Sequence, residues 1–278
     1  MSVAVVGLAL LAAILHASWN AFLRTGGDRL WTITVMSLSG ILVGLPFAAI
    51  YPWPDPSAWP FIFLSAGLQV GYILFLVAAY RYGELGQVYP IVRGTVPMLV
   101  TLGGFLVTGQ HLGIYQTIGV TLVAAGIMTL SFGSSRAPTA SMLLALATGA
   151  IIATYATVDS IGVRHAGHAG AYAAWVLITY GLGQVAAFVL LRGHLTLDFR
   201  SSVTWKALAG GVVALIAYGL VILAYTLGPA GPVTALRETS VIFAALIGWL
   251  FLGETLTRRR AVACVIVALG AIFIGYQR

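Results

Sequence analysis

Charged residues are scarce in this chain of 278 residues. Asp, Glu, Lys and Arg together make up 8% of it, against about 25% in a soluble globular domain. So few charges cannot form a surface that faces water, and 60% of the residues are hydrophobic. The composition argues against soluble enzymes and secreted scaffolds, and it predicts a helical membrane protein with several spans.

Cysteine and metal-ligand clusters are also lacking. The single cysteine, Cys264, lies in an apolar run, so it provides neither an internal disulfide nor a set of metal ligands. His165 and His168 have a loosely metal-like spacing without further ligands nearby, and we interpret them as part of a solvated loop. No nucleophile, base and orienting group form a recognisable set. We therefore expect neither an enzyme nor a cofactor or metal.

Apolar runs of about 20 residues, long enough to cross a bilayer as helices, recur along the whole chain. We count ten, at residues 3–22, 30–50, 58–80, 85–107, 113–132, 140–162, 169–191, 205–227, 231–252 and 260–276. The connections between them are short and rich in turn residues, so none could hold a soluble domain. The predicted fold class is an all-α membrane protein with ten transmembrane helices.

The net charge of +7 is spread over short groups between the apolar runs, which fits membrane topology better than a nucleic-acid partner. The connections after odd-numbered spans hold most of the basic residues: Arg24, Arg29, Arg81, Arg136, Arg192, Arg200, Lys206, Arg258, Arg259 and Arg260. The other connections and both tails hold only Arg164 and Arg278. The positive-inside rule then predicts that both termini lie outside the cytoplasm.

The two halves of the chain resemble each other, which is common in membrane transporters. A constant offset places Arg93 on Arg237, and it also pairs Gly104, Gly109 and Gly126 with Gly248, Gly253 and Gly270. We predict a first five-helix repeat at residues 1–136 and a second at 137–278. Because each repeat has an odd number of spans, the two should be inverted relative to each other.

Three charged residues stand out within the spans, where a charge costs roughly 2.5 to 3.5 kcal/mol at mid-bilayer. Arg93 lies between Pro90 and Pro97, which predicts a kinked or interrupted helix that lines a cavity. Its counterpart Arg237 is followed directly by Glu238. Because consecutive residues do not face each other on a helix, we expect at least one of them to point toward another helix or a central cavity.

Two interpretations of these charges remain open. In one, Arg93 and Arg237 bind an anionic group such as a carboxylate or phosphonate, which a guanidinium can hold with two hydrogen bonds. In the other, either arginine pairs with Glu238 or Asp159 and fixes helix packing. Glu238 itself could carry a proton or act only as a counter-ion.

Polar and aromatic side chains on two other spans complete the candidate binding site. His16 and Asn20 are four residues apart, as are Tyr155 and Asp159, so each pair shares a helix face. We expect both faces to line the cavity, with Trp19 and Tyr89 as aromatic walls; interhelical hydrogen bonding is the alternative. The glycine pairs Gly40 with Gly44 and Gly67 with Gly71 predict close helix packing.

The span pattern and three short segments resemble EamA-type members of the drug/metabolite transporter superfamily over nearly the whole chain. The segments are Leu15-His16-Ala17-Ser18-Trp19-Asn20-Ala21, Leu106-Val107-Thr108-Gly109-Gln110-His111-Leu112 and Leu250-Phe251-Leu252-Gly253-Glu254-Thr255-Leu256. The first-half copy of the last motif has Thr108 and Gln110 in place of leucine and glutamate.

The resemblance implies a multi-pass secondary transporter of the cell inner membrane, with a central cavity between two inverted halves. It also implies small-metabolite substrates such as amino acids, frequent outward transport, and termini in the cytoplasm, opposite to the charge count. The arginines favour an acidic or zwitterionic substrate. The alternative is a carrier of amphipathic or cationic compounds that uses Glu238, Asp159 and the aromatic residues.

Overall fold

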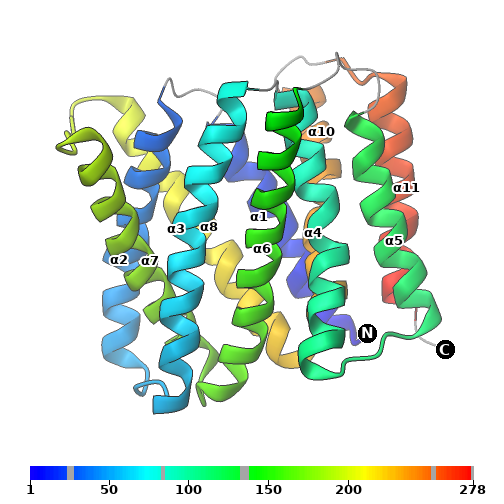
Figure 1. The fold of residues 1–278 in the computed structure, drawn as a ribbon, viewed down its shortest axis with the longest axis horizontal. Helices are drawn as coiled ribbons and strands as arrows, with labels where there is room; N and C mark the ends of the chain where they lie inside the picture. Colours follow the sequence, from blue (N-terminus) through cyan, green and yellow to red (C-terminus); the bar gives the residue numbers. More distant parts are fainter. Residues whose placement is uncertain (24–27, 83–84, 132–137, 252–254, 277–278) are drawn as a thin grey trace.

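The computed structural model describes residues 1–23, 28–82, 85–131, 138–251 and 255–276, and within these it leaves out the side chains of residues 20–23, 80–82, 85–87 and 251. The described residues form helices joined by short connections, side by side in one bundle (Figure 1). The first and the last of the described residues lie at the same edge of this bundle (Figure 1).

The first half contains α1 (Val3–Leu23), α2 (Arg29–Ile50), the 3-10 turn η1 (Pro56–Ala58), α3 (Trp59–Tyr82), α4 (Leu85–Thr108), α5 (Ile114–Met128) and the 3-10 turn η2 (Thr129–Ser131). The second half contains α6 (Thr139–His165), α7 (Ala169–Arg192), α8 (Ser202–Leu227), α9 (Ala230–Glu238), α10 (Ser240–Phe251) and α11 (Arg258–Gly275). Each of the ten predicted spans coincides with one of these helices, except that α9 and α10 share the ninth.

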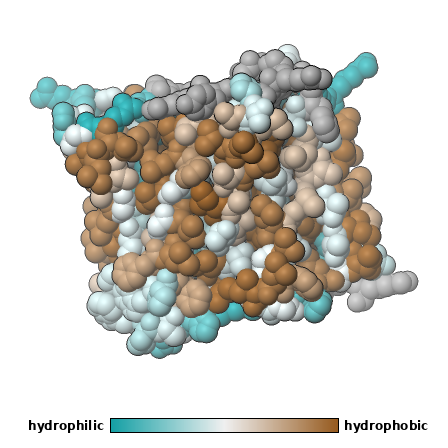
Figure 2. Space-filling model, in the orientation of Figure 1, coloured by the Kyte–Doolittle hydropathy of each residue, from teal (hydrophilic) through white to brown (hydrophobic). Residues whose placement is uncertain are grey.

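Eight of the helical segments are long and apolar enough to cross a membrane, and Val3–Trp19 is a shorter apolar helix. Figure 2 shows a broad hydrophobic belt between two hydrophilic edges on the visible face of the molecule. A multi-pass membrane protein is therefore confirmed, while the count of ten spans stays a prediction.

Side chains next to the connections fix where several helices begin. The Asp28 carboxylate accepts hydrogen bonds from the backbone N–H groups of Leu30 and Trp31 at the start of α2. The Ser201 hydroxyl caps α8 and the Thr257 hydroxyl caps α11 in the same way. These contacts satisfy backbone donors that have no partner inside a helix.

The expected interruption lies in the ninth span and not in the fourth. α4 is one helix from Leu85 to Thr108 with Pro90 and Pro97 inside it. Of the two predicted alternatives beside Arg93, the interruption is therefore wrong and the kink stays a prediction. In the second half, Thr239 separates α9 from α10. Its N–H bonds the Leu236 carbonyl at 3.1 Å and its carbonyl accepts from Ile242 at 2.9 Å. These are the tighter i to i+3 bonds of a 3-10 turn.

Only one of the two predicted glycine pairs packs closely. A Cβ on Gly44 would lie 3.1 Å from the carbonyl oxygen of Ala174 in α7, so α2 and α7 approach closely there. A Cβ on Gly67 or Gly71 would meet nothing within 4 Å, and that prediction is wrong. A closer contact joins α5 to α11, where a Cβ on Gly119 would lie 2.6 Å from the Gly270 carbonyl oxygen.

α9 lies at the centre of the helices that carry the predicted site. It packs against α1, α4, α5 and α8, and more loosely against α6 and α11. All nine residues of α9 are buried. Side chains from both halves of the chain therefore meet around a short, fully buried helix.

Candidate functional site

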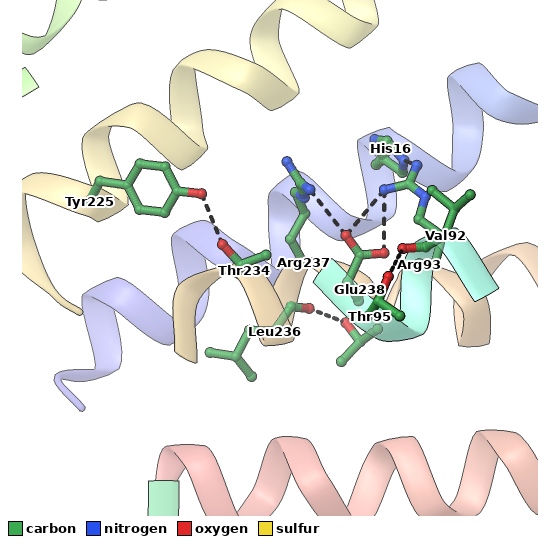
Figure 3. Close-up of polar contacts among 10 residues, drawn as sticks. His16, Val92, Arg93, Thr95, Tyr225, Thr234, Leu236, Arg237 and Glu238 are labelled. Atoms are coloured by element: carbon green, nitrogen blue, oxygen red, sulfur yellow. Dashed lines mark hydrogen bonds and ion pairs between the residues drawn. The ribbon is translucent and has the colours of Figure 1, made fainter. Parts of the chain in front are cut away.

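Two arginines from different halves of the chain bind one carboxylate at the end of α9 (Figure 3). Glu238 Oε1 accepts from Arg93 Nη1 at 3.1 Å and from Arg237 Nη2 at 3.0 Å, and its Oε2 accepts from Arg93 Nη1 at 3.3 Å. Glu238 is 2% exposed and Arg237 is 8% exposed. The cluster therefore places two formal positive charges and one negative charge inside the bundle.

The contact between Arg237 and Glu238 corrects the expectation that consecutive residues do not face each other. Neighbouring helical side chains leave the axis about 100° apart, but both of these side chains are long. Glu238 is also the last residue of α9, where the chain turns at Thr239. Both side chains can therefore turn toward Arg93 of α4.

His16 of α1 contacts the outer side of Arg93, with its Nε2 against Arg93 Nη2. A guanidinium only donates hydrogen bonds, so His16 Nε2 has to be the acceptor and the imidazole is neutral in this contact. The Trp19 ring packs edge-on against His16 at a centroid distance of 5.0 Å. The Tyr89 ring lies 5.4 Å from Arg93 Cζ, within the range of a cation–π contact.

Arg237 is the member of the cluster with unused hydrogen-bonding capacity. Its Nε is buried and has no hydrogen-bond partner among the described side chains, although buried polar atoms are almost always paired. With a neutral His16, the two arginines and Glu238 carry a net charge of +1. Asp159 is a further carboxylate that interacts electrostatically with Arg237. A buried donor on a positively charged group is suited to an anionic ligand.

Asp159 of α6 is buried among tyrosine hydroxyls. Its Oδ1 accepts from Tyr172 at 2.9 Å and its Oδ2 accepts from Tyr218 at 3.0 Å, and the residue is 1% exposed. The ion pairs found within the described part of the chain do not include Asp159. Of the two predicted counter-ions, only Glu238 pairs with the arginines.

Tyr155 lies one helical turn before Asp159 on α6, as its spacing predicts. It is buried, and its ring stacks on Tyr72 of α3 with centroids 5.6 Å apart. Arg237 interacts electrostatically with both Tyr155 and Asp159. The structure thus brings His16, Trp19, Tyr89, Arg93, Tyr155, Asp159, Arg237 and Glu238 into one region; the Asn20 side chain lies outside the described residues.

The sequence reasoning missed the tyrosines that hold Asp159 and Tyr155. Tyr172 and Tyr218 lie inside apolar spans, where a buried hydroxyl needs a partner, and this signal could have identified them.

Trp175 of the second half belongs to a separate aromatic group. Its ring lies 5.0 Å from the ring of Trp53 and 4.9 Å from the ring of Trp59. Among the described side chains, no group of three His, Cys, Asp or Glu residues could hold a metal ion.

Comparison with known proteins identifies the family of this chain. A solved structure titled "Crystal structure of protein" matches with a TM-score of 0.76 at 20% identity, over 99% of this chain and 98% of that chain, which supports the fold alone. No curated protein matches the sequence. The model of the EamA-like transporter family matches twice, over residues 4–132 and 139–276. The chain therefore belongs to the EamA-like transporter family.

Proposed function

We propose that this transporter moves a small metabolite that carries a carboxylate or a similar anionic group, and that Arg237 binds this group. An acidic or zwitterionic compound of amino-acid size meets that description. The observation that supports the proposal is the buried Arg237 Nε, which has no hydrogen-bond partner within the described part of the chain and belongs to a group of two arginines and Glu238 with a net charge of +1.

Glu238 acts in this proposal as a fixed counter-ion. Both of its oxygens accept from guanidinium groups, so it has no oxygen left without a cationic partner. It joins Arg93 of the first half to Arg237 of the second half and balances one of their two charges. A substrate anion beside Arg237 would balance the other.

The alternative substrate class, amphipathic or cationic compounds bound by Glu238 and the aromatic residues, has weaker support. A cation would have to approach Glu238 against two arginines that already bind it. The aromatic residues remain compatible with either class, since Tyr155 and Tyr72 offer ring faces as well as hydroxyls.

We further propose that residues 1–136 and 137–278 are inverted repeats of five spans each, which alternate access to the arginine cluster in the inner membrane. The arginines occupy equivalent positions in the two halves, one on α4 and one on α9, and meet on Glu238. A cluster that joins the two halves is where a rocking motion would expose a site to either side in turn. The resemblance implies that transport is often outward.

A ligand screen on purified protein tests the proposed substrate class. We expect some amino acids, organic acids or phosphonates to raise the thermal unfolding temperature, and amines or lipophilic cations to leave it unchanged. Arg237→Gln should bind the most stabilising anionic compound with an apparent affinity at least tenfold lower than that of the wild type. This loss corresponds to about 1.4 kcal/mol of binding free energy.

A matched control separates loss of the site from loss of positive charge. Arg192 lies at the end of α7, where it pairs loosely with Asp28 at 3.8 Å and is half-exposed, so Arg192→Gln should bind the anion as the wild type does. The proposal fails if only cations stabilise the protein. It also fails if folded Arg237→Gln binds the anion with wild-type affinity.

A further inference from the structure

Two buried carboxylates lie near the centre of the bundle, and their hydrogen-bond partners differ in chemistry. Glu238 accepts from two guanidinium groups, while Asp159 accepts from two phenol groups. A guanidinium can only donate, whereas a phenol hydroxyl can donate or accept. This difference decides which carboxylate can change its protonation state without losing its partners.

Glu238 is poorly suited to bind a proton. A protonated carboxyl carries an O–H that needs an acceptor, and neither Arg93 nor Arg237 provides one. Protonation would also leave both buried guanidinium groups without a counter-charge, which is strongly unfavourable inside a protein. Glu238 therefore fits the role of a counter-ion to the two arginines.

Asp159 has the opposite properties. A proton from water can add to one of its oxygens, and the hydroxyl of Tyr172 or Tyr218 can then rotate so that its oxygen accepts from the new carboxyl O–H. The ion pairs found within the described residues leave Asp159 without a cation in direct contact. An ionised carboxylate in such a place needs a cation or a proton.

We infer that Asp159 is the proton-binding residue of this transporter, and that a proton on Asp159 and an anion on Arg237 favour each other's binding. The inference rests on the proposed function, because opening of the bundle during alternating access would bring Asp159, 1% exposed here, into contact with water. It assigns to Glu238 the role of permanent counter-ion.

The groups around Asp159 are consistent with this role. The titratable and charged side chains that interact with it are Tyr155 on its own helix, Tyr172 of α7, Tyr218 and Tyr225 of α8, and Arg237 of α9. α3 contributes the Ser65 hydroxyl, and the charged residue of α4, Arg93, is paired with Glu238. The single cation among these neighbours is Arg237, the residue that we propose binds the substrate.

The linkage between proton and anion follows from charge. With Asp159 ionised, Asp159, Glu238 and the two arginines sum to zero; with Asp159 protonated, they sum to +1. An anion therefore binds better to the protonated form, and by reciprocity the anion strengthens proton binding. Under an inward proton gradient this linkage would drive uptake, opposite to the outward direction that the resemblance implies.

Infrared difference spectroscopy of the purified transporter during a pH titration tests the proton site without any substrate. We expect the wild type to show the band of a protonated carboxylic acid shielded from water. Asp159→Asn should lack this band, and Asp159→Glu should restore it. Glu238→Gln should keep the band but shift its appearance to lower pH, because the substitution removes a negative charge from the same group of residues. Gel filtration should confirm that each variant is folded.

Either of two spectra would overturn the assignment. One is a wild type without the shielded band at every pH where the protein is folded, and the other is a band that survives in Asp159→Asn. If Glu238→Gln does not fold, the comparison of wild type, Asp159→Asn and Asp159→Glu still shows whether the shielded band belongs to Asp159. These outcomes do not depend on whether a carboxylate is the substrate.

The effect of the Asp159 proton on anion binding is tested separately, by measuring the affinity for the most stabilising anion of the screen at different pH values. Its apparent affinity should rise at least tenfold on acidification in the wild type and should change little with pH in Asp159→Asn. An affinity that falls on acidification would overturn the linkage. If no anion in the screen binds, the infrared experiment still tests whether Asp159 binds a proton, because it needs no substrate.

Discussion

At the scale of single residues, the scarcity of charge made the site recognisable in the sequence. With few charged residues in the chain, Arg93, Arg237, Glu238 and Asp159 stand out within apolar spans, and all four lie in the candidate site. Their pairing could not be predicted in the same way. The pattern left Glu238 and Asp159 as equal partners for the arginines, and only the three-dimensional contacts separate them.

The tyrosine hydroxyls beside Asp159 give a prediction at this scale. Tyr172→Phe removes one of the hydrogen bonds to the buried Asp159 carboxylate, so it should lower the free energy of unfolding by about 1 kcal/mol. Thermal or denaturant unfolding of the purified protein in one detergent measures the difference.

Tyr180→Phe on the same helix is the matched control for Tyr172→Phe. The Tyr180 hydroxyl forms no hydrogen bond with the described residues, so its removal should change stability by much less. Equal effects of the two substitutions would mean that the bond to Asp159 contributes nothing specific.

At the scale of helices, apolar length predicted the elements well because a span needs only a run of about 20 apolar residues. The interruption was harder to place. Pro90 and Pro97 made α4 the better candidate, yet α4 is continuous and the break lies at Thr239. Neighbouring helices can compensate for the backbone groups that a proline leaves unpaired, so the sequence of one helix does not decide where it breaks.

Glycine spacing was similarly incomplete as a guide to helix contacts. Gly67 and Gly71 have the spacing of a packing motif but meet no neighbouring atoms within 4 Å, whereas Gly119 lies against the Gly270 backbone. Spacing describes one helix face, while close packing also needs a partner helix at that face. That partner is visible only in the folded structure.

The contrast between Gly119 and Gly67 gives a prediction for helix packing. Gly119→Ala puts a methyl group against the backbone of α11, and it should cost about 1 to 3 kcal/mol of stability. Gly67→Ala meets open space and gains up to about 1 kcal/mol of helix propensity. Paired unfolding measurements should therefore show effects of opposite sign, and destabilisation of similar size by both would contradict the packing of α5 on α11.

At the scale of the whole molecule, the family, the helical fold and the membrane embedding all follow from the pattern of the chain. The family model matches each half once, as the internal similarity leads one to expect. The orientation of the termini stays a prediction, since charge bias and family resemblance point to opposite sides. A reporter fused to the C-terminus, active in one compartment only, would decide it.

The two arginines and Glu238 connect the two halves of the chain at the proposed binding site. Glu238 pairs with Arg93 of the first half and Arg237 of the second, so motion of one half against the other must strain or remake these contacts. The substrate class could not be read from the sequence, because the unpartnered Arg237 Nε depends on how every neighbouring side chain packs. It is this atom that favours an anionic substrate.

Counterflow in proteoliposomes tests the central claim most directly. Vesicles loaded with the anion that best stabilises the protein should accumulate the labelled anion from outside through the wild type, and Arg237→Gln should reduce the initial rate at least tenfold. A lipophilic cation should not exchange. Exchange of the anion by folded Arg237→Gln at the wild-type rate, or exchange of the cation in place of the anion, would contradict the claim that Arg237 binds an anionic substrate.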